Sequence, residues 1–226
     1  MAQKRNRKAG SGFEEMKEHT SQALYAYWND VRGHRMAPKR FEIEPSCIAG
    51  ILPDTFILER IDPETTRFRL AGTRICEAFG AEFRGRNFFD LFQQEDRTTL
   101  QRQFSVIARR GAAGVFGVDA ETAAGKAAQF EITVLPLVHT RDVVDRFLGA
   151  IAPYKVQPWF GTEAIVKQKL VSNELVWPDG RPHALIDSSS RQSPFLPHIR
   201  TARIVHSDRR HFRVYDGGLS LNKDEQ

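Results

Sequence analysis

The sequence contains little cysteine and no long run of apolar residues. Its 226 residues include 2 cysteines, Cys47 and Cys76. Two thiols are too few for a disulfide framework or a four-thiolate zinc site, so we expect a cytoplasmic protein. No apolar run approaches the roughly 20 residues of a membrane-spanning helix. The basic stretch Lys4–Lys8 is not followed by an apolar stretch, so we also expect no signal peptide.

Motifs for catalysis and cofactor binding are missing as well. The sequence has no Gly-x-Ser-x-Gly, no Gly-x4-Gly-Lys, no Gly-x-Gly-x-x-Gly, and no kinase or nucleotide-cyclase motif. No pair of histidines has metal-ligand spacing, and His139 belongs to a predicted turn, where it cannot serve as a haem ligand inside the core. Cys76 lies in Arg-Ile-Cys-Glu-Ala, not in the Asn-Cys-Arg stretch that flavin photochemistry needs. We therefore expect no enzyme, no metal and no cofactor.

The net charge of +5 comes from the ends of the chain. Residues 1–40 hold 9 basic and 4 acidic side chains, residues 41–155 hold 14 and 16, and residues 156–226 hold 10 and 8. The middle of the chain is therefore slightly acidic. The basic tail would attract nucleic acid weakly and without specificity, and no helix-turn-helix pattern accompanies it, so we do not expect a nucleic-acid partner.

The N-terminal part is predicted to be a basic tail followed by a helical segment. Residues 1–13 are polar and are expected to be disordered. In the lead-in of residues 14–50, a helix is predicted from Glu14 to Val31, and a helical turn from Pro45 to Ile51. The longer helix carries an apolar stripe at i, i+3, i+4 and i+7, formed by Leu24, Tyr27, Trp28 and Val31.

Residues 51–155 show an order of elements that predicts an α+β domain. Two strands come first, then short helices and one longer helix, then three strands. The predicted elements are strands Thr55–Ile61 and Arg67–Ala71, a helix Arg74–Phe79 capped by Thr73 and ended by Gly80, a short element Phe88–Phe92, a helix Glu95–Arg110 ended by Gly111, and strands Gly114–Ala120, Ala127–Val138 and Asp145–Tyr154. This order predicts a five-stranded antiparallel sheet with helices packed on one face.

Residues 156–226 form a C-terminal extension with a weaker pattern. A helix is predicted from Gly161 to Val171, and the run Trp177–Pro182 has the composition of a loop. A hairpin with arms Ala202–His206 and His211–Tyr215 is a further candidate element. We expect this extension to be partly disordered.

Several short motifs resemble the signature of a stand-alone PAS-domain family of alphaproteobacteria, formerly catalogued as a domain of unknown function. The segment Arg69-Leu70-Ala71-Gly72-Thr73-Arg74-Ile75-Cys76 is the most specific of them. The others are Tyr27-Trp28, Arg32-Gly33, Arg35, Pro38, Arg40, Ile51-Leu52-Pro53, Phe79-Gly80 and Gly85-Arg86. The resemblance covers about residues 20–155. It implies a small cytoplasmic sensory or regulatory protein that has no output domain and contacts other signalling proteins, and some relatives are linked to cell-cycle and polar signalling.

A PAS-like scaffold places its sheet against short helices, and the hollow between them can hold a small ligand. The side chains expected to face that hollow are Cys76, Phe79, Phe88, Leu91 and Phe104. Because buried aromatic residues mostly serve area burial, we favour a packed core without a ligand at this place.

Two further features bear on partners. The stripe Leu24/Tyr27/Trp28/Val31 must be buried, either on the domain's own sheet, which we favour, or against a second protomer in a homodimer. Arg209 and Arg213 have the Arg-x-x-x-Arg spacing of a phosphate clamp, reminiscent of the PilZ motif for cyclic-di-guanylate, but the second half of that motif is absent. A solvated charged hairpin is the interpretation we favour for them.

The sequence thus predicts a non-catalytic PAS module that regulates bacterial signalling through protein contacts. Two alternatives stay open. One is a receptor with an obligatory small ligand in the hollow, and the other is a cyclic-di-guanylate-responsive adaptor that uses the two C-terminal arginines.

Overall fold

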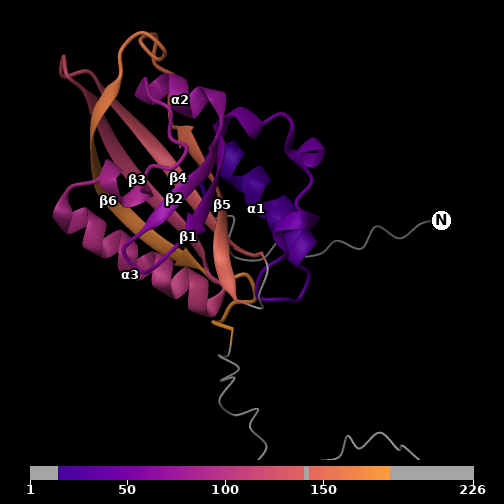
Figure 1. Ribbon diagram of the computed structural model, residues 1–226. Helices are drawn as coiled ribbons and strands as arrows, with labels where there is room; N and C mark the ends of the chain where they lie inside the picture. The colour runs from indigo at the N-terminus through magenta and orange to yellow at the C-terminus, as the bar shows by residue number, and fades with distance from the viewer. Residues whose placement is uncertain (1–14, 140–142, 184–226) are drawn as a thin grey trace, which may run out of the picture. The chain divides into compact units, whose positions relative to one another are not determined.

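A six-stranded antiparallel sheet forms the centre of the computed structural model, which describes residues 15–139 and 143–183 (Figure 1). The strands run in the order β2-β1-β5-β4-β3-β6. They are β1 (Thr55–Arg60), β2 (Thr66–Ala71), β3 (Ala113–Thr122), β4 (Ala127–Val138), β5 (Val144–Pro153) and β6 (Ile165–Val176). The predicted α+β class, the antiparallel sheet and the first five strands are confirmed.

The sixth strand, β6, was not predicted. The helix predicted over Gly161–Val171 is wrong, because β6 occupies most of that range. This strand pairs with β3 from Ala113↔Val176 to Thr122↔Ile165. Strand β3 already pairs with β4 on its other side, and β6 satisfies the backbone groups along its free edge. That long-range pairing outweighs the local helix propensity of Lys, Gln, Glu and Leu in this stretch.

Helices cover both faces of the sheet: the helices that follow β2 lie on one face, as predicted, and the N-terminal helix lies on the other. Helix α2 (Thr73–Phe79), the 3-10 turn η5 (Phe88–Leu91) and helix α3 (Gln94–Arg110) pack on what we call the inner face. Helix α1 (His19–Arg32) packs on the opposite, outer face, against β4 and β5. Figure 1 shows α3 and α1 on opposite sides of the strands.

Three short 3-10 turns connect α1 to β1 and lie beside α1 on the outer face. They are η2 (Arg40–Glu42), η3 (Pro45–Ile48) and η4 (Leu52–Asp54). Each of the last two has a proline in its first positions, where the missing backbone N–H costs nothing. The predicted helical turn from Pro45 is thereby confirmed in its first residues.

The N-terminal ends of α1 and α2 differ from the prediction, whereas the C-terminal ends of α2 and α3 agree with it. Helix α1 begins at His19 and not at Glu14, and the N-cap of α2 is Gly72, so Thr73 does not cap it. Helices α2 and α3 end at Gly80 and Gly111, as predicted, with φ of 58° and 69°. These left-handed conformations favour glycine because a Cβ would clash with the backbone.

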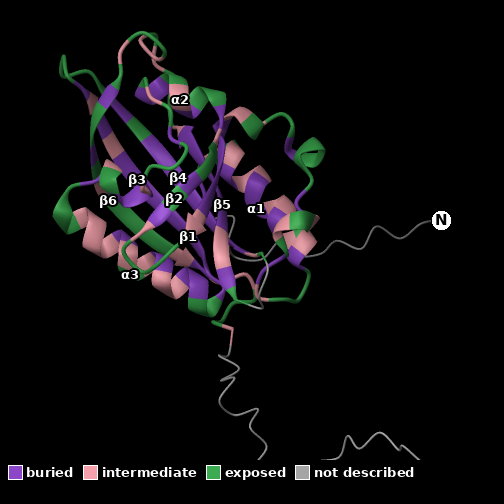
Figure 2. Cartoon of the chain, viewed as in Figure 1, coloured by how far each residue is buried: buried purple, intermediate pink, exposed green. Residues whose placement is uncertain are grey.

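Alternating side chains of each strand divide the buried residues into two cores (Figure 2). In β4, Phe130, Ile132 and Val134 point to the inner core, as their spacing predicts. Leu135 and Leu137 belong to the outer core with α1. The sheet is therefore buried on both faces in its central strands, where Figure 2 shows continuous purple.

Some predicted segments lie outside the described residues. These are the basic tail of residues 1–13, the C-terminal hairpin, and Arg209 with Arg213. All described residues belong to one compact unit. Within it, the stretch after β6 is a turn around Asp179 and Gly180, in agreement with the predicted loop.

Truncating a ring of the inner core should strongly destabilise the fold. Phe88 is fully buried, so Phe88→Ala is expected to lower the free energy of unfolding by about 3–5 kcal/mol, measured by urea denaturation. The same change at Phe41, whose side chain is 73% exposed, should cost less than about 0.5 kcal/mol. Equal losses in the two variants would contradict this assignment of the core.

Candidate functional site

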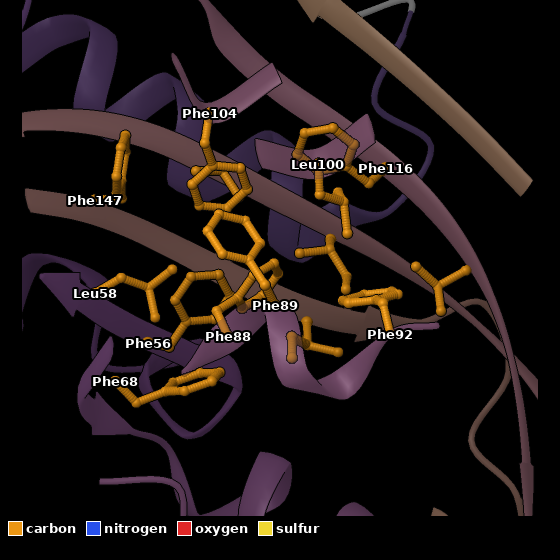
Figure 3. Close-up of a cluster of buried hydrophobic side chains, with 14 of the residues drawn as sticks. Phe56, Leu58, Phe68, Phe88, Phe89, Phe92, Leu100, Phe104, Phe116 and Phe147 are labelled. Atoms are coloured by element: carbon orange, nitrogen blue, oxygen red, sulfur yellow. The ribbon is translucent and has the colours of Figure 1, made fainter. Parts of the chain in front are cut away.

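The side chains predicted to face the PAS hollow all lie in or against the inner core. Phe79, Phe88 and Phe104 are buried members of that core, and Cys76 and Leu91 are partly buried against it. Figure 3 shows Phe88, Phe89 and Phe104 gathered in the middle of a cluster of rings. The structure therefore brings the five predicted residues to one core, from α2, η5 and α3.

Ring-to-ring contacts occupy the centre of this core. The centroid of Phe88 lies 5.2 Å from that of Phe104 and 6.0 Å from that of Phe56 on β1. Phe104 in turn lies 5.1 Å from Phe147 on β5 and 6.1 Å from Phe116 on β3. Such distances are those of favourable aromatic pairs, so side chains from the sheet and the helices meet directly between the two layers.

Cys76 lies at the edge of this core. Its side chain is partly buried, and burial raises the pKa of its thiol above the ordinary value, with a further contribution from the nearby carboxylate of Glu82. A raised pKa keeps the thiol protonated at neutral pH, and a protonated thiol is a poor nucleophile. The cysteine therefore behaves here as a small apolar side chain.

A hollow of about 320 Å³ opens at one end of the inner face, between α2 and the ends of β4 and β5. Its apolar lining includes Phe79, Phe130 and Ile151, and Phe160 from the segment after β5. Of the five residues predicted for the ligand pocket, Phe79 lines this hollow. This volume lies at the lower end of the range for small-molecule sites.

An ion pair lies at the polar rim of this hollow. The Asp54 carboxylate is buried and accepts a hydrogen bond from the Arg74 guanidinium at 2.5 Å. Burial raises the pKa of Asp54 above its ordinary value, and the positive charge of Arg74 partly opposes that rise. Arg74 is itself mostly exposed, so the pair joins the start of α2 to the turn before β1 at the surface.

On the outer face, α1 lies against β4 and β5 through the predicted stripe. Leu24 and Trp28 are completely buried there, and Tyr27 and Val31 are partly buried against the same core. The indole Nε1 of Trp28 donates a hydrogen bond to the Pro136 carbonyl at 2.8 Å. The stripe thus packs within the chain's own domain, which is the arrangement favoured from the sequence.

A buried carboxylate holds the chain at the start of α1. Glu131, on the outer face of β4, is 1% exposed. Its two carboxylate oxygens accept hydrogen bonds from the backbone N–H groups of Lys17 and Glu18, at 2.8 and 3.1 Å. Burial and the negative charge of Glu131 both raise the pKa of Glu18. We call this contact the N-terminal attachment of α1.

A buried arginine holds the other end of the helix. Arg32 is 2% exposed and binds Asp179, after β6, through two hydrogen bonds of 2.8 and 3.1 Å. It also donates to Asn29 Oδ1 and to the Arg35 carbonyl, and its guanidinium lies 5.5 Å from the centroid of a Trp28 ring. We call this contact the C-terminal attachment of α1.

Asp179 links this attachment to the chain that follows. His183 Nε2 lies 3.0 Å from Asp179 Oδ2, and the His183 backbone N–H donates to the Arg110 carbonyl at the end of α3. The hydrogen bonds from Arg32 hold the pKa of Asp179 below its ordinary value, and the charges of Arg32 and His183 act in the same direction. The segment after β6 is thus tied both to α1 and to α3.

Sequence reasoning did not identify Glu131 or Asp179 as positioning residues. Glu131 carries no signal of its burial, because Gln129, Glu131 and Thr133 alternate with Phe130, Ile132 and Val134 as in a strand with one solvated face. Asp179 carries no signal either, because an aspartate before glycine is ordinary in a turn. Its role depends on a contact between residues 147 positions apart.

Asp179→Asn should destabilise the protein in a pH-dependent way. The folded-state pKa of Asp179 lies below its unfolded value of about 3.9. Its charge therefore stabilises the fold above that value, and this contribution is lost as the pH falls through the folded-state pKa. At pH 7 we expect a loss of about 1–3 kcal/mol, because Arg32 stays buried without its anion.

Urea unfolding of wild type and Asp179→Asn at a series of pH values measures this effect. The difference in their free energies of unfolding should shrink as the pH falls below about 4. Asp30→Asn changes an exposed aspartate of α1 and should be nearly neutral throughout. A difference in free energy of unfolding between wild type and Asp179→Asn that stays constant over this pH series would contradict the charge-dependent attachment.

Residues 15–139 and 143–183 contain no group of three or more His, Cys, Asp or Glu side chains that could hold a metal ion. Within the same residues, no helix has the length and apolar character needed to cross a bilayer.

Comparison with known proteins identifies the domain. No curated protein shows significant sequence similarity to the chain. Among solved structures, the LOV protein of Rhodobacter sphaeroides matches with 15% identity and a TM-score of 0.38, covering 46% of this chain and 61% of that one. The PAS domain of an HTR-like protein from Haloarcula marismortui matches with 23% identity and a TM-score of 0.33, covering 50% of this chain and 94% of that one. This chain thus spans about three fifths of the LOV structure.

A family model described as PAS domain matches residues 16–152. That range begins before α1 and ends in β5. It contains the buried residues of the inner core other than Ile165, the Glu131 and Arg32 side chains, and the predicted signature segment around Cys76. Because the match covers more than half of the chain, the protein is a member of the PAS-domain family.

Proposed function

We propose that the protein is a non-catalytic cytoplasmic regulatory module that acts in bacterial signalling through contacts with other proteins. The observation that carries this proposal is the direct ring-to-ring packing of Phe88, Phe104 and Phe116 across the inner core, at the place where a PAS-like scaffold can hold a small ligand. A core filled in this way favours a signal received at the surface. PAS domains are in general sensory and not catalytic, and the free thiols Cys47 and Cys76 suit a reducing compartment.

Helix α1 is the element through which we expect partners to act. Its interface with the sheet includes two buried hydroxyl groups, Ser21 Oγ on α1 and Thr133 Oγ1 on β4, that have no hydrogen-bond partner within the described structure. A buried polar group without a partner costs about 1–3 kcal/mol. This cost partly offsets the stabilisation that the apolar contacts of Trp28 and Leu24 provide. Helix α1 is therefore held on the sheet less strongly than it would be by a fully apolar interface.

The two attachments define what a partner must change. Displacing α1 would expose the Glu131 carboxylate and the Arg32 guanidinium to water, which hydrates both charges. A partner that binds better when α1 is displaced would shift the population towards that arrangement. Because Arg32 is bonded to Asp179, the same change would reach the segment after β6.

Affinity purification of the full-length tagged protein from its native cells tests this proposal. A specific partner should be recovered in near-stoichiometric amount and identified by mass spectrometry, relative to the tag alone. Recovery of no protein beyond the tag control would argue against a function in protein contacts.

Thr133→Val tests whether α1 is the responsive element. The change removes an unpaired buried hydroxyl and keeps the side-chain shape, so it should raise the free energy of unfolding by about 1 kcal/mol and reduce partner recovery. Thr162→Val is the control at an exposed position, where the hydroxyl does have a partner, the Trp159 carbonyl; it should not raise the free energy of unfolding and should leave partner recovery unchanged. A stabilised Thr133→Val protein that recovers its partner as well as wild type would contradict the role of α1.

A small-molecule receptor is the second candidate, and the 320 Å³ hollow beside Phe79 favours it. If the first proposal holds, purified protein should be colourless and should show only the polypeptide mass in native mass spectrometry. Its melting temperature should also be unmoved by cyclic-di-guanylate, the ligand suggested by the spacing of Arg209 and Arg213. A retained molecule, or a shift with that nucleotide, would replace the first proposal by the corresponding receptor.

A further inference from the structure

A second hollow of about 400 Å³ lies on the outer face of the sheet, at the edge away from β6. Its floor is formed by Ile57 of β1, Leu70 of β2 and Leu148 of β5, which lie side by side in the strand register. The turns η2, η3 and η4 form one wall, through residues such as Ile48 and Leu52. We call this feature the β2 groove.

The β2 groove is apolar and accessible. Its only charged lining residue among those described is Arg40. Leu70 is 48% exposed and Leu52 is 36% exposed, although both have large aliphatic side chains. The neighbouring strands on the same face are covered by α1. Apolar side chains gathered at an open groove are typical of a binding surface.

Positive charge surrounds this apolar floor. In the next row of the same sheet face, Glu59 is opposite Arg67 on β2 and Arg146 on β5. Arg69 and Arg146 both form ion pairs with Glu59, at 3.3 and 2.8 Å. Arg69 and Arg146 thus share one carboxylate, Arg146 also lies 3.9 Å from Asp145, and Arg40 adds another positive charge inside the groove.

We infer that the β2 groove binds a short apolar segment of a partner protein that carries carboxylates beside its apolar side chains. Aliphatic or aromatic residues of that segment would contact Ile57, Leu70 and Leu148. Its Asp or Glu residues would pair with Arg40 at the groove wall. They would also pair with Arg67, Arg69 and Arg146 at the edge of the floor, where positive charges outnumber negative ones. This inference rests on the proposed function in protein contacts and specifies the surface and the partner chemistry.

Selection from a random-peptide library displayed on phage, with the full-length protein as bait, provides the probe. Enriched peptides should combine apolar residues with Asp or Glu. Their affinity, measured by fluorescence anisotropy with synthetic peptides, should fall by about tenfold or more in Leu70→Glu, because a carboxylate then occupies the apolar floor and repels the peptide's own. The affinity should also fall when the salt concentration rises.

Val171→Glu is the matched control, because Val171 is 53% exposed on β6, at the opposite edge of the sheet. It should leave peptide affinity unchanged. Leu52→Glu, on the groove wall, serves as the second variant should Leu70→Glu unfold. Failure to enrich acidic apolar peptides, or peptides that bind both groove variants as well as wild type, would overturn the inference. A concentration-dependent dimer in sedimentation that Leu70→Glu dissolves would overturn it too, by assigning the groove to a second copy of the chain.

The outcome can be separated from that of the proposed function. A cellular partner whose recovery is unaffected by Leu70→Glu would leave the function in protein contacts standing while removing the β2 groove as its binding surface. Recovery of no cellular partner would reject the proposed function, even where library peptides bind the groove.

Discussion

Burial of phenylalanine rings between the sheet and its inner helices is the interaction on which the rest of the structure depends. Helix α2 has 7 residues and η5 has 4, and neither would be stable in water by itself. Phe79 and Phe88 fix these short elements to rings contributed by β1, β2 and β4. The edge of the hollow, the position of Cys76 and the orientation of the Asp54–Arg74 pair all follow from that anchoring.

The outer face has a different character, and this difference bears on function. The inner face buries mostly apolar side chains, with Thr66 as an uncharged exception, whereas the interface under α1 includes the buried Glu131, Arg32, Ser21 and Thr133. Charged groups are held there by backbone N–H groups and by Asp179, and the two hydroxyls lack partners within the described residues. Buried polar groups lower the net gain from docking. We therefore expect the inner face to maintain the fold and the outer face to change with partners.

Much of the fold could be predicted because its signals are local. The alternation of Phe130, Ile132 and Val134 and the spacing of Leu100, Phe104 and Ile107 each report one buried face over a few residues. Gly80 and Gly111 mark helix ends for an equally local reason, their positive φ. Strand β6 could not be predicted in the same way, because its conformation depends on the free edge of β3, far from it in the sequence.

The candidate sites show the same contrast between local signals and contacts that are distant in sequence. The sequence by itself determined which residues are apolar and periodic enough to be buried, and this was sufficient to identify the stripe on α1. With the resemblance to a PAS scaffold it also placed Cys76, Phe79, Phe88, Leu91 and Phe104 together. Only the tertiary structure decided that α1 packs on the face opposite α3, that Arg32 meets Asp179, and that Leu70 stays exposed beside Leu52. Periodicity records that a side chain must leave water, but the partner it meets is set by chain segments that are distant in sequence.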